Sequence, residues 1–296
     1  RIQVIQAYVF PFTPTTAFPA PVTTQLPLGA VLNPLSFRVL HQMFWQMSKA
    51  GDAAVRREVG LRKPPFWGPF GALDRADTPV LYGYSAHVLP RPADWSERYT
   101  VTGYWFLDEP GSWQPPADLV DFLNAGDPPV YIGFGSMSSR NPEESGQIAL
   151  EALRRSGQRG VLASGWGGLK PTELPDNVHL ISALPHSWLF PRMAAVVHHG
   201  GAGTTAAGFR AGVPSIIVPF GLDQPFWGSR AVALGVGPRP IPRKQLTGAR
   251  LGEAITAAVT DQGMRQQAAD LGQKIRAEDG VDSAVASIER YLRSKR

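Results

Sequence analysis

The sequence has 296 residues, 43% of them hydrophobic and 18% charged, which is enough for a sizeable core and about two domains and excludes a disordered tail protein. Its net charge is +5, from 29 Lys and Arg against 24 Asp and Glu, yet these basic residues form no stripe, which argues against nucleic-acid binding. It has no Cys for disulfides or metal ligation, and no apolar run of the roughly 18 residues that a membrane helix needs.

The first half of the chain is rich in Pro and carries few regular elements. The sequence opens within an apolar run, without Met or the pattern of a signal peptide, so we expect the true start to lie upstream. These elements are too few for a complete sheet covered on both faces, so this lobe is expected to be incomplete. Apolar patterning predicts strands over residues 2–9, 80–85 and 100–104 and helices over 35–50 and 52–59.

From residue 127 onward, short apolar runs alternate with Ala-rich periodic stretches, which is typical of a doubly wound parallel sheet. We therefore expect an α/β protein with a partial first lobe over 1–126, a complete Rossmann-like lobe over 127–282 and a final helix over 283–296 that packs back on the first lobe. The strands are predicted at 130–133, 160–163, 178–181, 194–198 and 215–218. The helices are predicted at 142–155, 187–190, 204–211, 223–233, 248–259, 264–277 and 283–294.

The strongest motif is the stretch from Ala194 to Thr205, where an apolar strand leads into glycines and a new helix. Glycines let the backbone N–H groups of residues 201–204 approach an anion, and the helix N-terminus favours negative charge. His199 would add a hydrogen bond to the same phosphates. The alternative is a glycine turn that serves only tight packing, with His199 as a helix cap.

A second strand, beginning at Val130, also ends in glycines and is followed by Ser136, whose hydroxyl can donate to a phosphate. A nicotinamide dinucleotide fold is disfavoured, because the third glycine is replaced by Ser138 and no acidic residue for a ribose follows the next strand. Two glycine turns at the carboxyl ends of strands in one sheet instead predict a single crevice for a diphosphate.

Asp223 and Gln224 follow another strand on the same rim. A carboxylate beside an amide suits a vicinal diol, so together these side chains can bind sugar hydroxyls. The alternative is that Asp223 only caps the helix that follows.

With these motifs the chain resembles the inverting glycosyltransferases of family 1, and among them the sterol 3β-glucosyltransferases. These enzymes have the GT-B fold, in which two Rossmann-like lobes face each other across a cleft. The resemblance covers nearly the whole chain, and its motifs are long and in order. They are residues 185–190 (PHSWLF), 198–205 (HHGGAGTT), 223–224 (DQ), 94–97 (DWSE) and 101–108 (VTGYWFLD).

The resemblance implies a donor site for UDP-glucose. It places the pyrophosphate at Ser136, His199, Gly201, Ala202, Gly203 and Thr204. It places the hexose at Asp223 and Gln224, and the uracil at Ala183, Leu184 and Trp166. Trp166 is equally consistent with a core indole. Two positions depart from the plant relatives, which have Trp where Ala183 stands and Glu where Ala207 stands, so the selection of base and ribose is open.

The implied reaction is a single in-line displacement that moves glucose, with inversion, to a deprotonated hydroxyl of a sterol or other lipophilic acceptor. No cofactor or metal is expected, since the helix terminus stabilises the leaving diphosphate and the sequence has no Asp-x-Asp. The family's general base is a His near the start of the first lobe, which we expect upstream of Arg1.

The acceptor side is less distinctive. Phe10, Phe12 and Phe44 belong to an aromatic-rich region that forms either core or the wall of a hydrophobic acceptor site, and His87 is a further candidate for contact with the acceptor. The resemblance implies a cytoplasmic enzyme without a transmembrane segment, and peripheral membrane contact is compatible with it.

Three other functions stay open at this stage. The first is a natural-product glycosyltransferase that uses a TDP-sugar on a macrolide or polyphenol, and the second is a catalytically silent nucleotide-sugar-binding module. The third, a dinucleotide oxidoreductase, would need the missing acidic ribose ligand.

Overall fold

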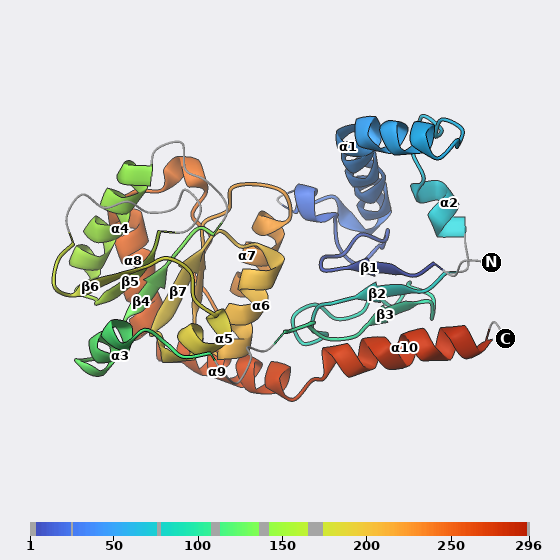
Figure 1. Ribbon diagram of the computed structural model, residues 1–296. Coiled ribbons are helices and arrows are strands. Elements are labelled where there is room, and N and C mark those ends of the chain that lie inside the picture. The colour runs from blue at the N-terminus through green and yellow to red at the C-terminus, as the bar shows by residue number, and fades with distance from the viewer. Residues whose placement is uncertain are drawn as a thin grey trace. The chain divides into compact units, whose positions relative to one another are not determined.

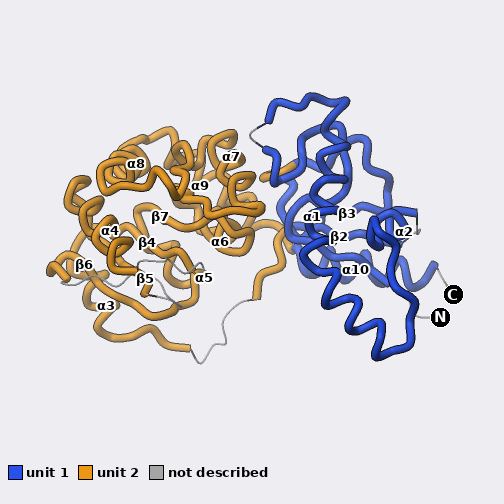
Figure 2. The backbone as a smooth tube through the Cα atoms, turned by 90° about the horizontal axis from the view of Figure 1, so that it is seen from above, with its two compact units in different colours: residues 1–86, 90–103, 280–296 blue, residues 87–89, 104–279 orange. Residues whose placement is uncertain are grey.

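A computed structural model describes residues 4–24, 26–75, 78–107, 113–135, 142–164 and 174–294. The chain forms two compact units, drawn in blue and orange in Figure 2. The first comprises Arg1–Ala86, Pro90–Gly103 and Gly280–Arg296, and the second comprises His87–Leu89 and Tyr104–Asp279.

The second unit is built on a five-stranded parallel sheet (Figure 1). All four strand pairs are parallel, and the order across the sheet is β6-β5-β4-β7-β8. The chain leaves β4 toward one edge and later returns to β7 beside it, so the order reverses between these two strands. Such a switch point in a parallel sheet opens a crevice at the carboxyl ends of the strands. The strands are β4 (Val130–Ile132), β5 (Gly160–Ala163), β6 (Val178–Ile181), β7 (Ala195–His198) and β8 (Ser215–Ile217).

Helices cover both faces of this sheet, and side chains alternate between the two faces along each strand. Val130 and Ile132 join a cluster with residues of α4 and α8, whereas Tyr131 between them joins a cluster with residues of α3 and α5. Burial on both faces explains why the strands are short apolar runs. The helices of this unit are α3 (Ala117–Asn124), α4 (Pro142–Ser156), α5 (His186–Leu189), α6 (Ala202–Ala211), α7 (Gln224–Ala233), α8 (Gly248–Thr260) and α9 (Gln262–Arg276), with 3₁₀ turns η2 (Phe190–Arg192) and η3 (Arg243–Gln245).

The first unit has a smaller sheet of three parallel strands in the order β1-β2-β3. Its core is aromatic, and the ring of Tyr82 on β2 stacks on Trp95 with centroids 4.7 Å apart. A second cluster gathers Phe12, Phe37 and Leu40. The elements are β1 (Gln6–Tyr8), η1 (Pro21–Thr23), α1 (Gly29–Glu58), α2 (Phe70–Arg75), β2 (Val80–Tyr82), β3 (Tyr99–Val101) and α10 (Gly280–Ser294).

The α/β architecture and the strands of the second unit agree with the sequence, but the first half differs in three respects. The helices predicted over 35–50 and 52–59 are one helix, α1, because Gly51 continues the helix instead of ending it. The short helix α2 was not predicted. Residues 104–126 belong to the second unit rather than to the first, since Leu119 of α3 is fully buried in a cluster of that unit. The final helix, α10, groups with the first unit, as expected.

Candidate functional site

The carboxyl edge of the second sheet gathers the residues for which the sequence predicts donor binding. Gly133 and Gly135 follow β4, His199 follows β7, Ala183 follows β6 and Asp223 follows β8. Neighbouring strands lie about 4.8 Å apart, so the four steps from β6 to β8 span about 19 Å. The predicted residues are therefore spread along one rim rather than gathered at one point.

The N-terminus of α6 lies on this rim after β7, the strand next to the central β4. Its N-cap residue is Gly201, with φ −60° and ψ 144°, and no side chain caps the helix. The first turn of a helix leaves N–H groups without partners inside the helix, and its dipole favours negative charge there. A side chain at Gly203 would meet no atom within 4 Å. The helix therefore begins with free donors and open space, which is what an anion requires.

The glycines before α6 are required by their surroundings. Gly200 has φ +87°, and a Cβ atom there would lie 2.6 Å from Cγ2 of Ile217. A Cβ atom at Gly201 would lie 2.4 Å from Nε2 of His199. Only glycine therefore allows β7 to turn directly into α6 with the imidazole of His199 lying over the turn.

The two histidines of this motif have different positions. His198 is buried, accepts a hydrogen bond at Nδ1 from the N–H of Gly200 (3.0 Å), and has its pKa lowered to about 3 by burial. His199 is half-buried, and burial lowers its pKa as well. Within the described residues, the Nδ1 atom of His199 is buried and has no partner. His199 is therefore a neutral imidazole, and the hydrogen-bonding capacity of its Nδ1 atom is not used by any described residue.

The turn after β4 meets the turn after β7. Gly135 has φ +62°, and a Cβ atom there would lie 3.2 Å from Cε1 of His199. This contact brings the two glycine turns together, as a single diphosphate crevice requires. Ser136, the predicted phosphate donor, lies outside the described residues, as does Trp166.

His186, at the start of α5, adds a third neutral imidazole to this region. Its ring stacks on Phe190 with centroids 4.3 Å apart, and burial, together with the neighbouring His199, lowers its pKa to about 4. Just before it, Ala183 is exposed and Leu184 is half-buried against the α3 and α5 side of the core. The predicted base segment is thus accessible next to His186.

Asp223 and Gln224 both have partners within the protein. Asp223 occupies the N-cap position of α7, yet its side chain caps no backbone N–H and instead accepts a hydrogen bond at Oδ2 from the indole of Trp227 (2.9 Å). The helix-cap alternative is therefore wrong. Burial raises the pKa of Asp223. The buried Gln224 accepts at Oε1 from the N–H groups of Phe220 (2.6 Å) and Gly221 (3.2 Å), which leaves its NH₂ group for a ligand.

The loop that presents Asp223 contains an unusual backbone conformation. Leu222 is exposed and has φ +56°, a region that residues other than glycine rarely adopt. Such strain costs about 1–3 kcal/mol and is found where surrounding structure fixes the backbone. Here the surrounding structure is the pair of hydrogen bonds from the loop to Gln224.

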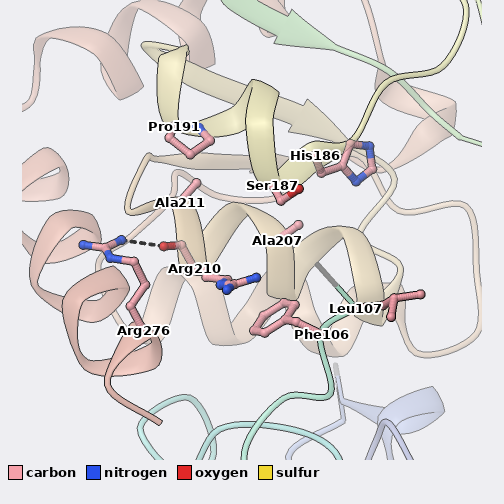
Figure 3. Close-up of a pocket in the computed structure, with 9 residues that line it drawn as sticks. All are labelled: Phe106, Leu107, His186, Ser187, Pro191, Ala207, Arg210, Ala211 and Arg276. Carbon is pink, nitrogen blue, oxygen red and sulfur yellow. Dashed lines mark hydrogen bonds between the residues drawn. The ribbon is translucent and has the colours of Figure 1, made fainter. Parts of the chain in front are cut away.

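A cavity of about 590 Å³ extends from His186 along the outer face of α6 (Figure 3). The guanidinium of Arg210 lies 4.4 Å from the ring centre of Phe106, and Nη1 of Arg276 donates to the carbonyl oxygen of Arg210 (2.6 Å). The cavity therefore offers cationic and apolar groups, and none of its lining residues within the described part of the chain is acidic. They are Phe106, Leu107, His186, Ser187, Pro191, Ala207, Arg210, Ala211 and Arg276.

The predicted acceptor residues belong to both units. Phe10, Phe12 and Phe44 pack against one another in the first unit, with centroids 5.6–6.0 Å apart. Phe12 is buried in that core. His87 belongs to the second unit, and its Nε2 atom lies 3.9 Å from Oε1 of Glu278. Their contact with an acceptor stays a prediction.

The first unit contains a larger cavity, of about 980 Å³, that the sequence did not reveal. It lies between α1 and α2 and has mostly apolar walls, with His41 donating from Nε2 to the carbonyl oxygen of Phe12 (2.8 Å) at its inner side. Its lining comprises Leu35, Arg38, Val39, His41, Gln42, Met43, Gln46, Trp67, Phe70, Gly71, Asp74 and Arg75.

Fold and site together define a class of protein, with a Rossmann-like unit and an uncapped helix N-terminus next to the switch point of its sheet. A family model described as "Erythromycin biosynthesis protein CIII-like, C-terminal domain" matches residues 168–289. The fold is shared with the glycotransferase of kitacinnamycin, with a TM-score of 0.64 and 20% identity, over 97% of this chain and 70% of that one. The GT-B fold is thereby confirmed.

Two relatives identify the family. Sterol 3-beta-glucosyltransferase UGT80A2 of Arabidopsis thaliana is 40% identical over 99% of this chain and 46% of its own length. O-mycaminosyltylonolide 6-deoxyallosyltransferase of Streptomyces fradiae is 39% identical over 97% of this chain and 67% of its own length. The chain belongs to the GT-B glycosyltransferase family of these two proteins, as its motifs predicted. It spans about half the length of the Arabidopsis relative.

Proposed function

We propose that the protein binds UDP-glucose in its second unit and transfers glucose, with inversion, to the hydroxyl of a sterol or another lipophilic acceptor. One observation carries this proposal: the order of the strands matches the order of the parts of the donor. The segment predicted to face the base follows β6 at one edge, the predicted anion site at α6 follows β7 next to the central β4, and Asp223, predicted to bind the hexose, follows β8 at the other edge.

The diphosphate would bind at the N-terminus of α6, where the free N–H groups and His199 are its donors. A neutral imidazole and backbone dipoles stabilise charge as it develops on the leaving diphosphate. Asp223 keeps one carboxylate oxygen for a sugar hydroxyl while the other accepts from Trp227. The nucleoside would occupy the region of Ala183 and the cavity beside His186.

This arrangement supplies positive potential at the leaving group without a metal ion, because the helix dipole points toward it. We therefore expect transfer to continue in the presence of EDTA. A large loss of activity that Mg²⁺ restores would contradict this part of the mechanism.

The acceptor would bind in the first unit, where the cavity between α1 and α2 is large enough for a flat lipophilic molecule. Its walls include Val39, Met43 and Phe70, and apolar walls with few polar groups are typical of sites for such ligands. Sterols are the favoured acceptors because the Arabidopsis relative is named for them.

The second candidate function is transfer of a deoxysugar from a TDP donor to a macrolide or polyphenol, as the name of the Streptomyces relative suggests. The described residues that line the cavity beside His186 favour neither ribose nor deoxyribose, because none of them has a carboxylate to accept from a 2′-hydroxyl.

The deciding experiment measures transfer from UDP-glucose and from TDP-glucose to a sterol and to a macrolide aglycone, with UDP binding followed by calorimetry. We expect turnover with UDP-glucose and the sterol. Preferred turnover with TDP-glucose and the macrolide would favour the second candidate. Saturable UDP binding without transfer to either acceptor would identify a silent nucleotide-sugar-binding module.

A further inference from the structure

The segment that joins α1 to α2 in Figure 1 ends in a tight turn. Two adjacent aromatic side chains of this turn are exposed. The N–H of Gly68 donates to the carbonyl oxygen of Pro65 (2.9 Å), so Phe66 and Trp67 occupy the tip of a β-turn. Both side chains are 72% exposed. We call residues 65–68 the aromatic turn. Large aromatic side chains with this exposure are uncommon on the surface of a folded protein.

The aromatic turn is anchored through its backbone. Gly68 has φ +75° and packs on the indole of Trp45, so closely that a Cβ atom would lie 2.7 Å from its Cγ atom. Trp45 is itself buried in α1. Phe66 and Trp67 contact each other edge to face, with centroids 5.1 Å apart. The fold therefore holds the turn in place while its aromatic side chains remain exposed.

Basic and apolar residues precede the aromatic turn. Arg57, Arg62 and Lys63 are exposed, as are Val59 and Leu61, whereas the stretch from residue 57 to residue 67 contains a single acidic residue. Basic side chains next to exposed aromatic and aliphatic groups complement the phosphates and the acyl boundary of an anionic bilayer.

The cavity of about 980 Å³ adjoins this surface, since Trp67 of the aromatic turn is one of its lining residues. A lipophilic molecule that leaves a bilayer at the turn would therefore meet an apolar cavity directly. Continuity between the exposed aromatic surface and the cavity favours a lipid surface as the partner over a second protein.

We propose that the aromatic turn and the basic residues before it form a docking surface for anionic phospholipid bilayers. Phe66 and Trp67 enter the interface between headgroups and acyl chains, and Arg57, Arg62 and Lys63 contact lipid phosphates. This surface belongs to the first unit, whereas the proposed donor site belongs to the second, and its occupation needs no nucleotide sugar.

The test is co-sedimentation of the full chain with vesicles of phosphatidylcholine alone and with vesicles that also contain phosphatidylglycerol. We expect binding to the mixed vesicles that weakens in high salt. The double variant Phe66→Ala/Trp67→Ala should reduce partitioning by at least about tenfold, because it removes the two inserted side chains. Arg62→Gln/Lys63→Gln should reduce it by about 25-fold, at about fivefold for each basic group.

Matched controls are Val232→Ala, which removes an exposed apolar side chain of α7 in the second unit, and Arg265→Gln/Lys274→Gln, which removes two exposed charges of α9. Both should bind vesicles like the parent chain. Circular dichroism and UDP binding show that every variant is folded, and all changed side chains are exposed.

The proposal is wrong if the parent chain does not bind mixed vesicles, or if the aromatic and basic variants bind them like the controls. Sedimentation equilibrium tests the competing occupant. A dimer that Phe66→Ala/Trp67→Ala dissociates, without any vesicle binding by the parent chain, would assign the surface to a second copy of the chain.

Discussion

Replacing Gly203 by Ala should change UDP binding at the N-terminus of α6 and the stability of the helix in opposite directions. Gly203 is the second residue of α6, is exposed, and has no atom within 4 Å of where its Cβ would lie. Alanine fits the helical backbone and lowers the entropy of the unfolded chain, so the second unit should gain about 0.5–1 kcal/mol. The Cα–Cβ bond of a helix tilts toward the N-terminus, so the new methyl group extends into the space proposed for the diphosphate.

The expected effect on binding has the opposite sign. Loss of one close contact between a backbone N–H and a phosphate costs about 1.5–3 kcal/mol, which raises the Kd for UDP about 10- to 100-fold. Calorimetry with UDP and urea unfolding measure the two quantities on the same protein. Gly51→Ala in α1 is the matched control, because Gly51 is also helical with no atom nearby and should change stability alone. A Gly203→Ala protein that is more stable and binds UDP normally would refute the anion site.

Three further changes test other parts of the site. His199→Ala should weaken UDP binding. In steady-state assays it should also lower turnover by about 10²-fold, which is the effect of losing one oxyanion donor. Asp223→Asn keeps an acceptor for the Trp227 indole, so it should impair use of UDP-glucose while UDP affinity stays unchanged; equal loss for both ligands would place the sugar elsewhere. The pKa of His186 is lowered to about 4 in the folded protein, whereas it is about 6.5 in the unfolded chain. As pH falls below about 6.5, the unfolded chain therefore takes up this proton before the folded protein does, and the free energy of unfolding declines down to about pH 4. Between pH 6 and pH 5, protonation of His186 lowers the free energy of unfolding by about 1 kcal/mol. Urea unfolding of His186→Phe should lack this contribution, and a pH dependence equal to that of the parent chain would contradict the role of His186.

The second unit was largely predictable because its elements have strong local signals. Strands buried on both faces are continuous apolar runs, so β5 and β6 begin and end where the sequence predicts. The turn into α6 was predictable for a similar reason, since Gly200 and Gly201 are needed for backbone geometry that no other residue allows.

Other features depend on contacts between distant residues. The cavity beside His186 is closed by Phe106 and Arg210, which are far apart in sequence and follow no spacing rule. His87 acquires a carboxylate neighbour, Glu278, only through the fold. The sequence predicts separate helices on the two sides of Gly51, but α1 continues through it, because one glycine inside a helix costs only about 1 kcal/mol.

The first unit is assembled from three separate stretches of the chain, and the last of them contains α10. During synthesis, residues up to 103 emerge well before residue 280, with residues 104–279 of the second unit made in between. At about 5–20 residues per second, this interval lasts roughly 10–35 s. The second unit can complete itself on the ribosome, whereas the first must wait for its final helix. The nascent chain thus passes through a period in which one unit is finished and the other is still open to chaperones.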